Sequence, residues 1–215
     1  MNFFAHAVVA SWHSREPLFV FGAMLPDLIG MTGVRLAGTT DEALRRGIDL
    51  HHATDAAFHS APVFTQLCAE AIARLAEEGV ERGTSRAVAH VGFELTLDGV
   101  LSSEPEPREL YAAALDIAGS GVLEGKLSTS PASGLSRLTA GLHRLARASI
   151  PVAYAEPDVV AERLQIILAP RPRLAMRPSD FEPVRRWAAD VRPQVVARRY
   201  ELLDQVRRGL TSQAG

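Results

Sequence analysis

The stretch that decides the fold is residues 39–59, which read TTDEALRRGIDLHHATDAAFH. Thr39 and Glu42 have the Thr-x-x-Glu spacing of a capping box, in which each side chain satisfies a backbone N–H at the start of a helix. Apolar residues then recur every three or four positions as far as His59, and Pro62 follows shortly after. The pattern predicts one long helix that ends near this proline.

The same spacing of apolar side chains recurs through most of the chain, whereas alternating β-branched residues are scarce. Pro26 is expected to interrupt or kink the apolar segment LFVFGAMLPDLIG (18–30), with a loop at 30–38 and a linker at 102–107 (SSEPEP). The other expected helices are 2–13, 63–78, 84–101, 108–118, 133–148, 157–168 and 180–208. The sequence therefore predicts an all-α protein with a long C-terminal helix, as a single domain over residues 1–215.

Composition excludes several classes of protein. The chain has 215 residues, of which 47% are hydrophobic and 22% are charged, so it is neither disordered nor collagen-like. Its one cysteine, Cys68, excludes an intramolecular disulfide framework and a cysteine-based zinc cage. A net charge of −2 argues against nucleic-acid binding. We expect no membrane span and no secretion signal, and hence a cytoplasmic protein.

Positive charge is concentrated near the C-terminus. Residues 171–215 contain ten arginines and five acids, a surplus of +5, which leaves −7 for residues 1–170 and gives the total of −2. One interpretation is an ordinary solvated helix. The other is a docking face for an acidic partner, because arginine makes planar, bidentate contacts with carboxylates and phosphates.

Histidines and carboxylates are spaced four residues apart on two of the expected helices, which places each set on one helix face. The first set is His51, Asp55 and His59, with His52 beside His51, and the second is His90, Glu94 and Asp98. His6 and Asp27 lie in two further apolar segments. Polar groups in apolar surroundings must pair or bind a metal, because leaving them unpaired is costly.

Two interpretations of these sets remain open. Each histidine could be a hydrogen-bonded core residue, or it could donate only to the carboxylate one turn away. Alternatively, the sets could form a metal site, because imidazole and carboxylate ligands without thiolate suit Mn²⁺, Fe²⁺, Mg²⁺ or Zn²⁺. A metal there would serve phosphoester hydrolysis by polarising a phosphoryl oxygen and activating water.

Four of these segments, in this order, resemble the acyl carrier protein phosphodiesterase family, whose fold is thought to be related to the HD-domain phosphohydrolases. They are MNFFAH (1–6), FGAMLPD (21–27), GIDLHHATD (47–55) and FELTLDGVL (93–101). The likeness covers residues 1–101 well and 170–208 loosely, the latter through RPRL (171–174).

The resemblance implies an HD-domain-like helical bundle, with the metal-site helices in residues 1–101 and additional helices in 108–215. It implies an enzyme, a phosphodiesterase that uses a divalent metal such as Mn²⁺ to remove the 4′-phosphopantetheine arm from holo acyl carrier protein. Carried over position by position, it assigns the metal or catalytic set to His6, Asp27, His51, Asp55, Glu94 and Asp98. We add His90 as a further candidate ligand, and we expect His52 or His59 to protonate the leaving oxygen.

The chain departs from the family pattern at three positions. The arginine that follows the family's histidine is His52 here, and a second family aspartate aligns with His59. The family's Asp-His pair is Asp98-Gly99, while His90 lies one turn before Glu94.

The segment GAMLPD also resembles zinc-dependent phospholipase C-like hydrolases. Two alternatives therefore accompany the carrier-protein substrate: a hydrolase of another phosphoester, and a non-catalytic helical interaction protein.

Overall fold

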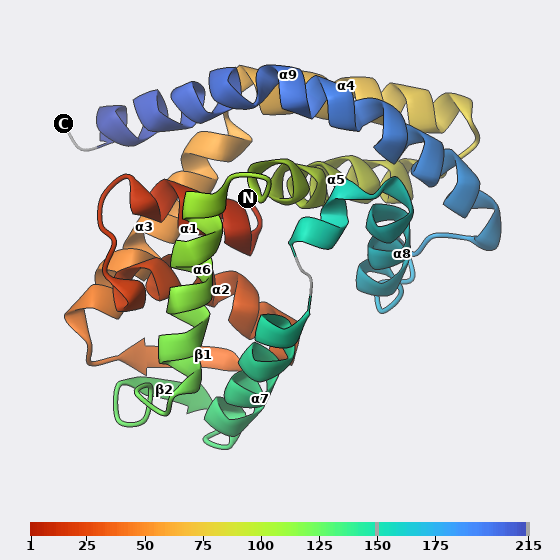
Figure 1. Cartoon of the computed structure of the whole chain (residues 1–215). Coiled ribbons are helices and arrows are strands. Elements are labelled where there is room, and N and C mark those ends of the chain that lie inside the picture. Colours follow the sequence, from red (N-terminus) through yellow and green to blue (C-terminus); the bar gives the residue numbers. More distant parts are fainter. Residues whose placement is uncertain (149–150, 214–215) are drawn as a thin grey trace. The chain divides into compact units, whose positions relative to one another are not determined.

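The computed structural model describes residues 1–148 and 151–213, and helices account for most of them (Figure 1). The all-α prediction and the long C-terminal helix are thus confirmed. The chain divides into two compact units, which are described separately below. Unit 1 comprises Met1–Asp55 and Leu101–Ile150, and unit 2 comprises Ala56–Val100 and Pro151–Gly215.

Unit 1 is built around one apolar helix, α2, which contacts α1, α6 and α7. The interior of the unit is aliphatic and aromatic, and Phe4, Phe21 and Met24 are fully buried. The elements of the unit are α1 (Phe3–Ser11), α2 (Pro17–Thr32), β1 (Arg35–Thr39), most of α3 (Glu42–His59), α6 (Pro105–Gly119), β2 (Leu127–Ser130) and α7 (Gly134–Arg147). Burial of this apolar surface is the main contribution to the stability of unit 1, and it fixes the positions of α1 and α2 relative to each other.

Two short strands are the part of unit 1 that the sequence did not predict. β1 pairs antiparallel with β2, from Arg35 opposite Ser130 to Thr39 opposite Leu127, with an irregularity between Leu36 and Gly38. The expected loop at 30–38 is therefore wrong in part, because α2 continues to Thr32 and β1 begins at Arg35. Strands of four and five residues are too short to show an alternating pattern in the sequence.

The start of α3 is capped by a different residue from the one that the sequence predicted. Asp41 Oδ1 accepts hydrogen bonds from the backbone N–H groups of Ala43 (3.0 Å) and Leu44 (3.1 Å). Thr39 Oγ1 instead donates to the carbonyl of Lys126 and accepts from the N–H of Asp41. The Thr39–Glu42 capping box is therefore wrong, because Thr39 belongs to the strand pair.

Asp41 gives a testable prediction about stability. Asp41→Ala should lower the free energy of unfolding by about 1–2 kcal/mol, the usual cost of losing an N-cap acceptor. Asp41→Asn keeps a side-chain acceptor and should lower the free energy of unfolding by less, although it loses the ion pair with Lys126. Urea denaturation of the three proteins at pH 7 measures both differences. Equal stability of Asp41→Ala and the native chain would contradict the capping role.

The same side chain predicts a pH dependence. The hydrogen bond from the Lys126 ammonium holds the pKa of Asp41 below its usual value, although burial acts in the opposite direction. A lowered native pKa means that the stabilisation is present above the unfolded-state pKa, about 4, and is lost as the pH falls through the native pKa. The stability difference between the native chain and Asp41→Asn should therefore shrink below about pH 4.

Helices α2 and α3 approach each other through glycines. A Cβ atom on Gly47 would lie 2.3 Å from the Phe19 carbonyl oxygen and 2.8 Å from Gly22 Cα, so no other residue fits without a shift of backbone. Pro26 lies inside α2 and does not end it. Since proline has no N–H, the Gly22 carbonyl lacks its usual helical donor in this turn. The carbonyl beside it, that of Ala23, accepts a hydrogen bond from His51 of α3.

Unit 2 is organised along α9, which contacts α4 and α8. Trp187 of α9 is buried and packs against Gly92 of α5, where a Cβ atom would lie 2.6 Å from the indole ring. Its elements are the end of α3, α4 (Pro62–Glu77), α5 (Arg82–Leu101), η1 (Val152–Ala155), α8 (Pro157–Leu168), η2 (Pro178–Asp180) and α9 (Phe181–Gln213). The expected linker at 102–107 is shorter than predicted, because α6 of unit 1 already begins at Pro105.

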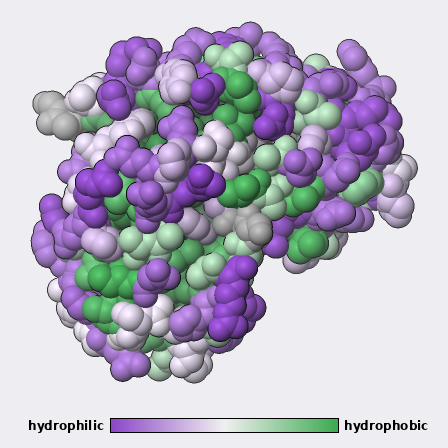
Figure 2. Space-filling view, in the orientation of Figure 1, coloured by the Kyte–Doolittle hydropathy of each residue, from purple (hydrophilic) through white to green (hydrophobic). Residues whose placement is uncertain are grey.

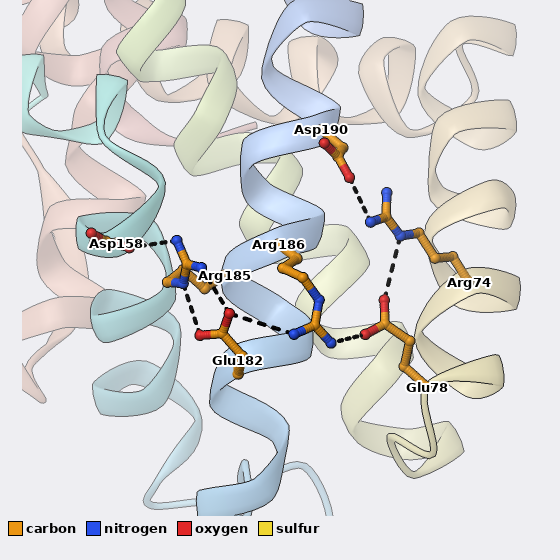
Figure 3. Close-up of polar contacts among 7 residues, drawn as sticks. All are labelled: Arg74, Glu78, Asp158, Glu182, Arg185, Arg186 and Asp190. Carbon is orange, nitrogen blue, oxygen red and sulfur yellow. Dashed lines mark hydrogen bonds and ion pairs between the residues drawn. The ribbon is translucent and has the colours of Figure 1, made fainter.

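Arginines of α9 are engaged in ion pairs within unit 2 (Figure 3). Arg186 pairs with Glu78 of α4 and with Glu182, while Arg185 pairs with Glu182 and with Asp158 of α8. Hydrophilic residues dominate the surface at the upper right of Figure 2. Part of the positive surplus of the C-terminal segment is thus balanced locally, as expected for a solvated helix. Each such exposed ion pair contributes only about 0–1 kcal/mol to the free energy of unfolding.

Among the described residues, no helix combines the length and the apolar character that crossing a membrane requires.

Candidate metal centre

Four of the predicted site residues come together inside unit 1. Ligand atoms of His6, Asp27 and His51 lie within 4.8 Å of one another. Asp55 lies beside these three residues without belonging to their set of converging ligand atoms, with Oδ1 3.2 Å from His6 Nε2 and Oδ2 3.4 Å from His51 Nε2. His6 Nε2 is 3.9 Å from Asp27 Oδ2. We call these four residues the unit 1 cluster.

Three helices deliver the side chains of the unit 1 cluster. His6 lies in α1, Asp27 follows the internal proline of α2, and His51 and Asp55 lie one turn apart on α3. The spacing of four residues puts His51 and Asp55 on the same face. The imidazole rings of His6 and His51 stack, with centroids 3.9 Å apart and an interplanar angle of 26°. Stacking and burial hold both rings in fixed orientations.

The hydrogen bond of His51 determines which of its nitrogens faces the cluster. Nδ1 lies 2.9 Å from the Ala23 carbonyl oxygen, so this nitrogen carries the proton and donates it. Burial, and then the proximity of His6, lower the pKa of His51 to about 3. The ring is therefore neutral at neutral pH, and the lone pair on Nε2 faces Asp55. Metal-binding histidines are commonly oriented by such a bond from the second nitrogen to a carbonyl.

Asp55 supplies a fixed negative charge to the cluster. Burial alone would raise its pKa, but the hydrogen bond from His6 and the nearby α-amino group of Met1 hold the pKa well below its usual range. The Met1 amino group donates to Asp55 Oδ1 at 2.7 Å. Asp55 is thus a carboxylate throughout the physiological pH range, as a metal ligand must be.

The donor set of the unit 1 cluster fits a divalent metal ion. Ligand atoms bound to one ion at about 2.0–2.3 Å lie about 3–4 Å apart, depending on the angle between them. The spacing of 3.9 Å between His6 and Asp27 falls in this range, and so do the spacings from the two oxygens of Asp55 to His6 (3.2 Å) and to His51 (3.4 Å). Two imidazole nitrogens and two carboxylates without sulfur suit Mn²⁺, Fe²⁺ or Zn²⁺. The side chain of His6 is 1% exposed and that of Asp55 is 31% exposed, so the cluster is open to solvent on the Asp55 side.

The remaining predicted residues lie elsewhere. His90 and Glu94 of α5 come together with His59 at the end of α3, within unit 2. His59, which the sequence suggested as a proton donor, thus lies among candidate metal ligands of unit 2. Asp98 is fully buried one turn beyond Glu94 and belongs to neither group of converging ligand atoms. Its charge acts on the hydroxyl of Tyr154. His52 is exposed and lies edge-on to His51, with ring centroids 5.3 Å apart.

Two contacts of the unit 1 cluster escaped sequence reasoning. The Ala23 carbonyl and the Met1 amino group are main-chain atoms, and side-chain patterns carry no information about them. The internal proline three residues after Ala23 was the one available signal, because a proline disturbs the carbonyls of the preceding turn.

Comparison of the chain with protein-family models, with curated proteins and with solved structures found no match.

Proposed function

We propose that this chain is a cytoplasmic metal-dependent phosphodiesterase whose ion is held by His6, Asp27, His51 and Asp55. The resemblance of its motifs points to holo acyl carrier protein as substrate and to Mn²⁺ as the ion; the phosphate stays on the released 4′-phosphopantetheine arm, and the carrier's hydroxyl oxygen is the leaving group. The observation that carries the proposal is the orientation of His51. Its hydrogen bond to the Ala23 carbonyl directs Nε2 toward Asp55 in the same way as in metal sites.

The chemistry needs a Lewis acid, a group that orients the attacking water and an acid for the leaving oxygen. A bound divalent ion would supply the first by polarising a phosphoryl oxygen. Asp55 is ionised and partly exposed, so it can orient the attacking water by accepting a hydrogen bond from it. His52 is the residue of unit 1 suited to protonate the leaving oxygen, because it is exposed beside His51.

A carrier-protein substrate also agrees with the charge distribution. Carrier proteins of this class are acidic, and residues 171–215 hold ten of the 23 basic residues. Arg185 and Arg186 are paired within unit 2 and would have to exchange partners to bind an acidic protein. The arginines of this segment supply bidentate donors for the carboxylates of an acidic partner.

The direct test is incubation of the purified chain with holo acyl carrier protein and Mn²⁺, followed by intact-mass measurement of the carrier. We expect the carrier to lose the mass of the 4′-phosphopantetheine arm in the presence of Mn²⁺ and to keep it in the presence of EDTA.

Two negative results correspond to the two alternatives. Hydrolysis of bis(p-nitrophenyl) phosphate without release of the arm would indicate a hydrolase of another phosphoester. Failure of the chain to bind any divalent ion would contradict the proposed enzyme and would favour the non-catalytic helical interaction protein.

A further inference from the structure

Unit 2 holds a second set of converging ligand atoms that the proposed function does not use. His59 of α3 and His90 and Glu94 of α5 each offer one ligand atom, and these atoms lie within 4.8 Å of one another. We propose that these three residues, the unit 2 cluster, form a second and separate metal site that binds Zn²⁺ through two imidazole nitrogens and one carboxylate oxygen.

Both imidazoles of the unit 2 cluster point at the same oxygen. Glu94 Oε1 lies 3.3 Å from His59 Nε2 and 3.2 Å from His90 Nε2. Without an ion, the imidazoles hydrogen-bond to this carboxylate. Two ligands at about 2.0–2.1 Å from a tetrahedral Zn²⁺ are about 3.3 Å apart. The two observed spacings match edges of such a tetrahedron.

The charge state of Glu94 fits this role. Its side chain is 13% exposed, and burial acts to raise the pKa, but hydrogen bonds from His59 and His90 hold the pKa of Glu94 well below its usual range. An ionised carboxylate is the form that binds a divalent ion, and a neutral imidazole is the form in which histidine does.

Aromatic side chains surround the unit 2 cluster and restrict its motion. Phe64 packs on both imidazoles, with ring centroids 5.4 Å from those of His59 and His90. Phe93 packs in turn on Phe64 at 5.4 Å. An apolar wall of this kind excludes water from one side of a site and strengthens the attraction between ion and ligands.

The opposite side of the cluster is open. The side chains of His59 and His90 are 37% and 46% exposed, so an ion bound by three protein atoms keeps a position for water or another ligand. Three protein ligands and one open position are the pattern of catalytic zinc, and His₂Glu is one of its common ligand sets. Cys68 does not belong to this set of converging ligand atoms, and its thiol donates a hydrogen bond to the Ala89 carbonyl.

The test is Zn²⁺ binding by the full chain after chelator treatment and gel filtration, with zinc counted by elemental analysis. His90→Gln should bind one zinc fewer per chain than the native protein, or should bind the second zinc about 100-fold more weakly. The exposed position of His90 makes the substitution safe for folding, which circular dichroism checks. His143→Gln is the matched control, because His143 is also exposed on a helix and belongs to neither cluster.

Nuclear magnetic resonance of the imidazole nitrogens locates the ion. Zinc should shift the ring signals of His59 and His90, and these shifts should persist in Asp55→Asn, which disables only the unit 1 cluster. A full zinc count in His90→Gln, or unshifted rings of His59 and His90, would overturn the second site. Either result leaves the proposed phosphodiesterase unaffected, because that proposal depends on the zinc or manganese lost in Asp55→Asn.

Discussion

Asp55→Asn should abolish metal binding at the unit 1 cluster and reduce phosphodiesterase activity at least about 100-fold while the chain remains folded. The amide has the same shape as the carboxylate but carries no negative charge, so it is a much weaker ligand for a first-row divalent ion. The side chain is 31% exposed, so the substitution leaves no empty space in the core. Its effect on the free energy of unfolding should stay within about 1–3 kcal/mol, the range for a changed buried hydrogen bond.

Elemental analysis after dialysis and the carrier-protein mass assay measure the two losses together. His143→Gln should change neither of them. If Asp55→Asn kept its full metal content, Asp55 would be a hydrogen-bonding residue only, and the non-catalytic helical protein would become the better interpretation. Loss of metal without loss of activity would separate the ion from the chemistry and would also overturn the proposal.

Helix positions were predictable because apolar side chains repeat with the helical period. The expected helix at 157–168 matches α8 (Pro157–Leu168), and the helix expected to run through His59 matches the end of α3. Prolines at the first position of α4 and α8 mark the start of these helices, since proline needs no helical hydrogen bond there, whereas the proline that starts α6 falls inside the expected linker. The two strands were not predictable, because their pairing joins residues about 90 positions apart.

From helical spacing alone, the candidate sites were predictable only within single helices. The spacing of four residues places His51 beside Asp55 and His90 beside Glu94, and the structure has these pairs 3.4 and 3.2 Å apart. Periodicity does not indicate which faces of different helices meet. His59 shares a face with His51 in the sequence pattern, yet it lies 3.3 Å from Glu94 of another helix. The division of the candidate ligands into two clusters therefore required the tertiary structure.

The close packing of α2 on α3 should be the most sensitive structural feature of unit 1. Gly47→Ala would place a Cβ atom 2.3 Å from the Phe19 carbonyl oxygen and 2.7 Å from the Ala23 nitrogen. Both are backbone atoms, so the clash cannot be relieved by rotating a side chain, and α2 must move away from α3. Overpacking of this kind costs about 3 kcal/mol, and the higher helix propensity of alanine recovers at most about 1 kcal/mol.

The same movement should damage the metal site, because the Ala23 carbonyl that orients His51 lies in the displaced turn. We expect Gly47→Ala to lower the melting temperature by about 5–10 °C, and to weaken metal binding at the unit 1 cluster about 10- to 100-fold even though no ligand is changed. Gly30→Ala is the control in the same helix α2, since a Cβ atom there meets nothing within 4 Å and should be neutral or slightly stabilising. Thermal denaturation and equilibrium dialysis with Mn²⁺ measure the two effects. A Gly47→Ala protein that melts and binds metal like the native chain would show that the backbone contact does not position His51.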